Sequence, residues 1–104
     1  MGTRSIIRVE GLEFAQIYKH WDGYPSEMQK PLEEFNADFE EKRGDDPQYK
    51  FAQLLRRSPK ILSDDSEYTG FWVTPMGVDC WEEYIYTLRF DGSVDCKDVY
   101  ADNN

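Results

Sequence analysis

Apolar and polar residues alternate along the first twenty positions in the pattern of two short β-strands. The Glu-Gly pair at 10–11 supplies turn chemistry between them. A two-residue turn pairs Val9 with Leu12, and Ile7 with Phe14, so apolar side chains meet across the hairpin. The pattern therefore predicts an antiparallel hairpin whose second strand turns its even-numbered residues toward the core. Because both faces carry apolar residues, at least one strand should lie centrally in a sheet.

The stretch 26–43 shows helical spacing instead. Its apolar stripe contains Met28, Leu32, Phe35 and Phe39. Ser26 and Gln29 fit a capping box at the start of this helix. Pro31 removes a backbone hydrogen bond wherever it lies inside a helix, so the helix either begins near Pro31 or begins at Glu27 and kinks.

A second helix is bounded by clear start and stop residues. Asp46 is expected to cap its N-terminus, and Pro47 suits the first helical position. Pro59 is expected to end it. The buried stripe of this helix should contain Phe51, Leu54 and Leu55.

Three strands are predicted after the helices. A short one covers 70–74 and ends at Pro75. Two more flank the Asp-Gly pair at 91–92, which is a strong hairpin signal. We favour a loop of odd length there, because only an odd loop places Leu88 on the same face as Val94.

The predicted order of elements is β-β-α-α-β-β-β, which indicates an α+β fold. We expect an antiparallel sheet of about five strands with two helices packed on one face. Residues 1–100 should form a single compact domain, and residues 101–104 a loose C-terminal tail.

The charge of the chain is strongly uneven. Its 21 acidic and 12 basic residues give a net charge of −9, and residues 61–104 alone contribute −8. Such a field repels phosphate backbones and anionic lipid and favours the basic surface of a partner protein, so direct nucleic-acid binding is not expected. The carboxylates predicted to bind that partner are Asp79, Glu82, Glu83, Asp91, Asp95 and Asp98. The alternative is a solvated face that only aids solubility.

Several classes of function lack their sequence signals. There is no secretory h-region and no uncharged run long enough to span a bilayer, so we expect a cytoplasmic protein without a membrane partner. Zinc spacings, phosphate loops and dinucleotide glycine patterns are also missing, so no metal and no cofactor are predicted. Cys80 and Cys96 are expected to remain reduced and too far apart for a disulfide.

The only histidine lies in the segment KHWDGYP at 19–25. His20 could act as a general base with Asp22 orienting its ring, and these two are the weak candidates for catalysis. A Cys–His pair would need Cys80 or Cys96 to approach His20. The alternative is a structural turn, in which Asp22 bonds its own backbone and His20 ends the core face of the hairpin.

Large aromatic side chains could line a groove or fill the core. The residues in question are Trp21, Tyr24, Phe71, Trp72, Trp81, Tyr84 and Tyr86. Because a chain of this size has few other large side chains, the core is the favoured place for them.

Three stretches resemble a group of small prokaryotic and phage-associated proteins. The start MGTRS, the turn HWDGYP at 20–25 and the ending EYIYTLRFDGSV at 83–94 carry the resemblance. It implies a bacterial or phage setting, and it assigns no reaction. It also implies a joint structural role for the residues Thr3, Arg4, Asp22, Gly23, Tyr24 and Pro25, in which Arg4 could bond the Asp22 turn.

The sequence leads us to expect a non-enzymatic protein-binding module. In a phage setting it could inhibit a bacterial defence complex, of the CRISPR kind, through its acidic surface. One alternative is a small enzyme or ligand-binding protein that uses the turn of His20, Asp22 and Tyr24. The other is a self-associating accessory subunit or homodimer built on a sheet edge.

Overall fold

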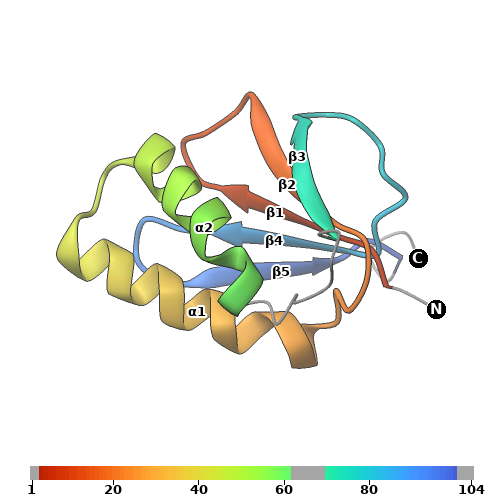
Figure 1. Ribbon diagram of the computed structural model, residues 1–104, viewed down its shortest axis with the longest axis horizontal. Helices are drawn as coiled ribbons and strands as arrows, with labels where there is room; N and C mark the ends of the chain where they lie inside the picture. Colours follow the sequence, from red (N-terminus) through yellow and green to blue (C-terminus); the bar gives the residue numbers. More distant parts are fainter. Residues whose placement is uncertain (1–2, 62–69, 101–104) are drawn as a thin grey trace.

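The computed structural model describes residues 3–61 and 70–100, apart from the side chains of residues 59–61. Its elements follow the predicted order (Figure 1). They are β1 (Ser5–Val9), β2 (Ala15–Lys19), α1 (Pro25–Lys42), α2 (Pro47–Ile61), β3 (Phe71–Pro75), β4 (Tyr84–Leu88) and β5 (Val94–Asp98). The predicted tail at 101–104 lies outside the described residues. Neither helix combines the length and apolar character that crossing a bilayer requires.

Both helices cover one face of a five-stranded sheet, as Figure 1 shows, so the α+β prediction is confirmed. The strand order is β3-β2-β1-β4-β5. Three of the neighbouring pairs are antiparallel, but β1 and β4 run parallel, so the sheet is mixed. The predicted central strand is β1, whose Ile6 and Ile7 are both buried, one on each face.

The predicted register of the first hairpin is wrong. Ile7 pairs with Ile17, which leaves a five-residue connection instead of a two-residue turn. Leu12 bends back so that its N–H bonds the Val9 carbonyl, and its side chain enters the core. Phe14 is instead 68% exposed. In the observed register Ile7 pairs with an odd-numbered residue of β2 and not with an even-numbered one. The even-numbered residues of β2 therefore point away from the helices.

The second hairpin has the predicted odd loop. Leu88 pairs with Val94, and Tyr86 with Cys96. Cys80 and Cys96 are both free thiols. The pairing is correct here because Leu88 and Val94 both belong to the single core cluster.

Helix α1 begins earlier than either predicted start. Pro25 is its first residue and Tyr24 its N-cap, without a side-chain capping bond, so the predicted capping box does not form. Gln29 instead donates to the Val94 carbonyl at 2.8 Å and ties α1 to β5. The helix continues through Pro31, and its predicted apolar stripe is buried.

Helix α2 begins as predicted and ends later. The Tyr49 N–H bonds the Asp46 carboxylate at 3.2 Å, which confirms the N-cap. Pro59 lies within the last turn, and the helix extends to Ile61. The prediction that Pro59 ends the helix is therefore wrong by two residues.

One cation is fully buried between the helices and the second hairpin. Lys50 of α2 is 0% exposed and forms an ion pair with Glu40 of α1. Its ammonium group also donates to Asn36 Oδ1 at 2.7 Å, while the Asn36 amide donates to the carbonyls of Arg89 and Ser93. This polar network joins both helices to the loop between β4 and β5.

Candidate functional site

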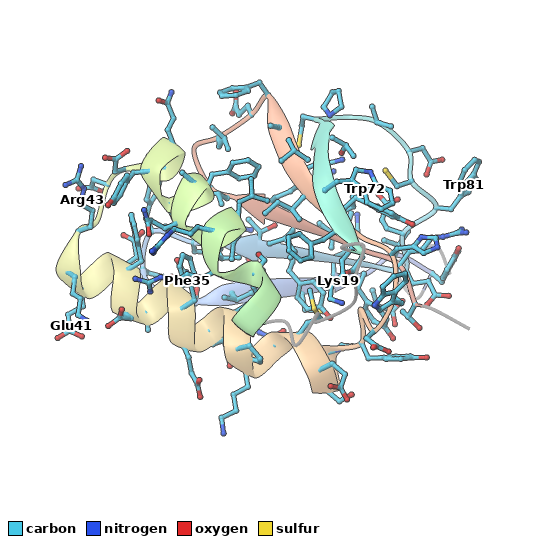
Figure 2. The ribbon with its side chains drawn as sticks, viewed as in Figure 1. Lys19, Phe35, Glu41, Arg43, Trp72 and Trp81 are labelled. Carbon is cyan, nitrogen blue, oxygen red and sulfur yellow. The ribbon has the colours of Figure 1, made fainter. Side chains whose placement is uncertain are left out.

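A hollow of about 290 Å³ lies on the sheet face that the helices leave uncovered. Its lining comes from even-numbered residues in and directly after β2, from one residue of β3, from the segment before β1 and from the loop 76–83. The residues are Arg4, Tyr18, His20, Trp72, Asp79, Cys80 and Trp81. Trp72 and Trp81 are 48% and 71% exposed, and Figure 2 shows them on the same end of the molecule, away from Phe35 and Arg43 on the helices.

One wall of this aromatic hollow is a stack of rings. Tyr18 pairs directly with Trp72 across the strands, and their ring centroids are 4.9 Å apart. His20 stacks on Trp72 at 6.2 Å, and the Tyr18 hydroxyl bonds His20 Nδ1 at 2.7 Å. Burial raises the pKa of the Tyr18 phenol, and the Arg4 guanidinium beside it opposes that rise. His20 is therefore oriented by Tyr18, not by Asp22 as the general-base hypothesis requires, and it does not lie on the core face.

The other wall is the loop between β3 and β4. Trp81 has a φ of 56°, a left-handed conformation that is unusual for a bulky side chain and is found mostly where the surroundings enforce it. The Asp79 carboxylate accepts the Trp81 N–H at 2.9 Å. The Glu82 carboxylate accepts the Cys80 N–H at 3.3 Å. Two acidic side chains thus fix the loop that holds the Trp81 ring in solvent.

The hollow brings Cys80 and His20 together, which the sequence spacing did not indicate. Cys96 is not part of the hollow. It pairs with Tyr86 across β4 and β5, so its side chain lies on the helix side of the sheet. Burial raises the pKa of the Cys80 thiol, and the nearby carboxylates of Glu82 and Asp79 raise it further. A nucleophilic cysteine needs a lowered pKa, so this electrostatic environment opposes Cys–His catalysis.

This environment predicts a sluggish thiol. In a Cys96→Ser variant, we expect Cys80 to react with iodoacetamide with an apparent pKa above that of the same chain in denaturant, because fewer thiolates form at any given pH. The measurement is the alkylation rate against pH. A folded-state pKa below the denatured value would instead identify an activated thiolate and revive the Cys–His hypothesis.

The turn around residue 23 has a structural geometry. The Gly23 N–H donates to the Thr3 carbonyl at 2.9 Å, and the Gly23 carbonyl accepts the buried Tyr86 hydroxyl at 2.6 Å. Asp22 adopts a left-handed φ of 56° and is exposed, and Pro25 opens α1. Tyr24 is exposed as well. The turn therefore joins the start of β1, the sheet and the first helix.

Arg4 contributes to the hollow and not to this turn. Its carbonyl accepts the Glu83 N–H, and its side chain lies beside Tyr18. Among residues 3–61 and 70–100, no hydrogen bond or ion pair joins the Arg4 side chain to Asp22. The contact between the start of the chain and this turn is made by the Thr3 carbonyl, which accepts the Gly23 N–H.

The predicted acidic residues separate into two groups. Asp79, Glu82 and Glu83 precede β4, and Asp98 pairs with Tyr84 at the same end; we call these four the acidic end. The other two lie toward the opposite end of the hairpin: Asp95 is three residues from Asp98, about 10 Å along β5, and Asp91 lies in the loop beyond. Asp91 bonds Ser93 within its own turn, and Asp95 forms an ion pair with Arg89 at 2.6 Å. Of the acidic end, Asp79 lines the aromatic hollow, and Glu82 and Glu83 follow in the same loop, whereas Asp98 pairs with Tyr84 on the helix side of the sheet.

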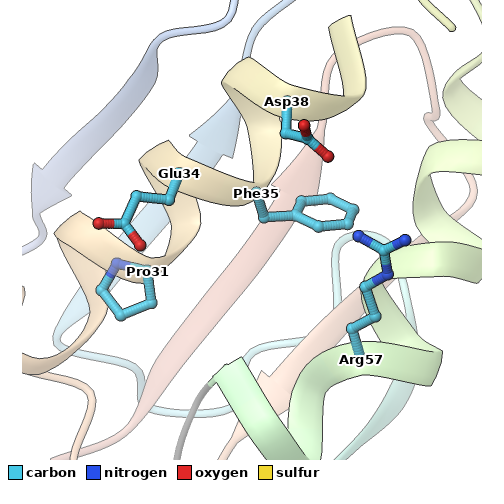
Figure 3. Close-up of a pocket in the computed structure, with 5 residues that line it drawn as sticks. All are labelled: Pro31, Glu34, Phe35, Asp38 and Arg57. Atoms are coloured by element: carbon cyan, nitrogen blue, oxygen red, sulfur yellow. The ribbon is translucent and has the colours of Figure 1, made fainter. Parts of the chain in front are cut away.

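A further depression of about 370 Å³ lies between the two helices (Figure 3). It is lined by Pro31, Glu34, Phe35, Asp38 and Arg57. Arg57 approaches the Phe35 ring at 5.9 Å, while the Asp38 carboxylate is paired with Lys42 at 2.9 Å. The lining combines two carboxylates with one guanidinium group, and these charges partly neutralise one another, so no single ligand chemistry is favoured.

The sequence analysis treated Trp72, Trp81, Phe71 and Tyr86 as one group of aromatic residues that could fill the core or line a groove. In the structure Phe71 and Tyr86 are buried, whereas Trp72 and Trp81 are exposed. It missed Tyr18 and the position of Arg4. The signal that could have found Tyr18 is its alternation with Ile17, which marks opposite faces of one strand.

Metal chemistry finds no support in the described ranges. No three His, Cys, Asp or Glu side chains of residues 3–61 and 70–100 come together as metal ligands would. The acid pair at 64–65 lies outside those ranges.

Comparison with protein-family models, with curated proteins and with solved structures finds no match to this chain.

Proposed function

We propose that the chain is a non-enzymatic protein-binding module that docks through the aromatic hollow and the acidic end. The supporting observation is the juxtaposition of two exposed tryptophans, Trp72 and Trp81, with the carboxylates of the loop 76–83. Tryptophan is enriched among residues that dominate binding energy, and exposed apolar side chains that share one patch mark interaction sites.

The charge favours a basic partner. Residues 61–104 carry a net charge of −8, and such a field accelerates encounter with a positive surface. In the cytoplasm of a bacterial host, the setting that the resemblance implies, the partner would be a subunit of a defence complex. Carboxylates would occupy a basic groove of that subunit in competition with nucleic acid.

The test is capture of partners from host lysate on the immobilised chain at low and moderate salt. We expect Glu82→Lys with Glu83→Lys to abolish capture, because the double reversal inverts the charge beside the hollow. The matched control is Glu33→Lys with Glu41→Lys on the exposed side of α1, which changes the net charge equally.

Support requires a captured protein that is lost in the first variant and retained in the control. Capture of nothing at either salt, or equal loss in both variants, would contradict the proposal. Size-exclusion chromatography with light scattering separates this module from a self-associating homodimer.

A further inference from the structure

The two tryptophans that flank the hollow are held in place before any partner arrives. Trp72 is supported from below by Tyr18 and from the side by His20. The backbone that carries the Trp81 ring is fixed by its left-handed conformation and by the Asp79 carboxylate, which accepts the Trp81 N–H. Walls that need no rearrangement reduce the entropy lost on binding.

The size of the hollow restricts its occupant. Its volume of about 290 Å³ is at the lower limit of pockets that enclose small molecules, which run from roughly 300 Å³ upward. An amphipathic helix needs a longer groove for side chains spread over several turns. A short extended segment that inserts one or two side chains fits the available space.

The hollow presents hydrogen-bond donors that have no partner within the described part of the chain. No described residue accepts a hydrogen bond from the indole N–H of Trp72 or Trp81, and Arg4 offers further donors. A polyproline II segment makes no internal hydrogen bonds, so all its carbonyls remain available to such donors. Its proline rings also pack flat against aromatic walls, which is how aromatic-lined grooves recognise proline-rich peptides.

The charge at the rim specifies what flanks the prolines. Asp79 and Glu82 each use a carboxylate oxygen to fix the loop and lie beside the hollow with Glu83. These carboxylates attract lysine or arginine and repel phosphate, so a nucleotide whose base stacks on the indoles is disfavoured.

We propose that the hollow between Trp72 and Trp81 receives a proline-rich segment in the polyproline II conformation, with flanking basic side chains against Asp79 and Glu82. The inference rests on the proposed function for the existence of a protein partner and names the segment by which that partner is bound. The third tryptophan, Trp21, does not line the hollow; it lies beside Gly70 and against the far side of the ring stack at His20, and it serves as an internal reference.

The experiment is a ¹H–¹⁵N NMR titration of the full chain, in which the three tryptophans give three indole signals. The probe is a synthetic decapeptide of prolines and alanines with two arginines at each end, added to millimolar concentration. We expect the Trp72 and Trp81 indole signals to shift and saturate while the Trp21 signal stays in place. Trp81→Ala should weaken binding at least tenfold, and Phe14→Ala, an exposed aromatic at the other end of β2, should leave it unchanged.

A second probe replaces every proline by alanine or serine and keeps the arginines. Equal shifts with this peptide would show charge attraction alone and overturn the inference. Shifts of neither indole with the proline peptide would also overturn it, and charge-dependent capture from lysate would then leave the proposed function standing. Shifts with tetramethylammonium but not with the proline peptide would identify a cation cage instead.

Discussion

Replacing Glu40 with alanine should lower the free energy of unfolding by about 3–5 kcal/mol, because it leaves a buried ammonium group without its ion-pair partner. Lys50 is completely buried and lies between the rings of Phe39 and Phe90, so water cannot replace the lost carboxylate. In a domain of this size, that loss corresponds to a fall in Tm of about 12 °C or more. Urea unfolding followed by circular dichroism measures it.

Two variants test this explanation. Adding Lys50→Met to Glu40→Ala removes the unpaired charge and should recover about half of the lost stability. Asp38→Ala on the same helix breaks only an exposed pair with Lys42 and should cost less than about 1 kcal/mol. If Glu40→Ala costs no more than Asp38→Ala, the buried pair does not hold the helices to the sheet.

Gly23→Ala should destabilise the protein by about 3 kcal/mol for a steric reason. A Cβ atom at this position would lie 2.7 Å from the side chain of Ser5 and from the Thr3 carbonyl, and the sheet leaves neither free to move. The shift would also disturb the hydrogen bond from the Tyr86 hydroxyl. Burial raises the pKa of Tyr86, which keeps this hydroxyl protonated as a donor. Thermal unfolding of the variant measures the effect.

The control is Gly77→Ala, where the new Cβ meets nothing within 4 Å but the φ of 89° disfavours alanine. It should cost about 1 kcal/mol through the backbone alone. Comparable losses in the two variants would mean that the turn is not tightly packed against β1. Combining Ser5→Gly with Gly23→Ala should show favourable coupling, because the smaller neighbour removes two of the close contacts.

The two hairpins show why one register could be predicted and the other could not. Between Leu88 and Val94, only one parity of loop brings apolar side chains together, so the pattern decides the pairing. Between Val9 and Ala15, the connection contains Leu12, whose own burial satisfies the core from within the loop. The local pattern could not separate an apolar strand residue from an apolar loop residue.

The wrong register of the first hairpin placed His20 on the wrong face of the sheet. With the predicted register, His20 ends the core face, whereas in the structure it joins Tyr18 and Trp72 on the uncovered face. The approach of Cys80 and Trp81 depends on the path of the loop 76–83, which no periodicity describes. The acidic composition of the C-terminal part was visible in the sequence, but its division between the two ends of a hairpin was not.

The polar core was also beyond the reach of the pattern. Lys50 directly precedes the predicted stripe residue Phe51. A lysine in an amphipathic helix is normally expected to face solvent. Its burial depends on Asn36 and Glu40, which come from a different helix. Partners so distant along the chain leave no local signal.

The parallel pairing of β1 with β4 has a consequence for biosynthesis. A ribosome releases β1 and β2 early, but the second neighbour of β1 emerges only with residues 84–88. At ordinary translation rates the nascent hairpin waits roughly 3 to 14 seconds with one edge of β1 unpaired. Ile6 and Ile7 are exposed to chance aggregation during that interval, so expression yield should depend on chaperone supply and on the speed of elongation through the helical region.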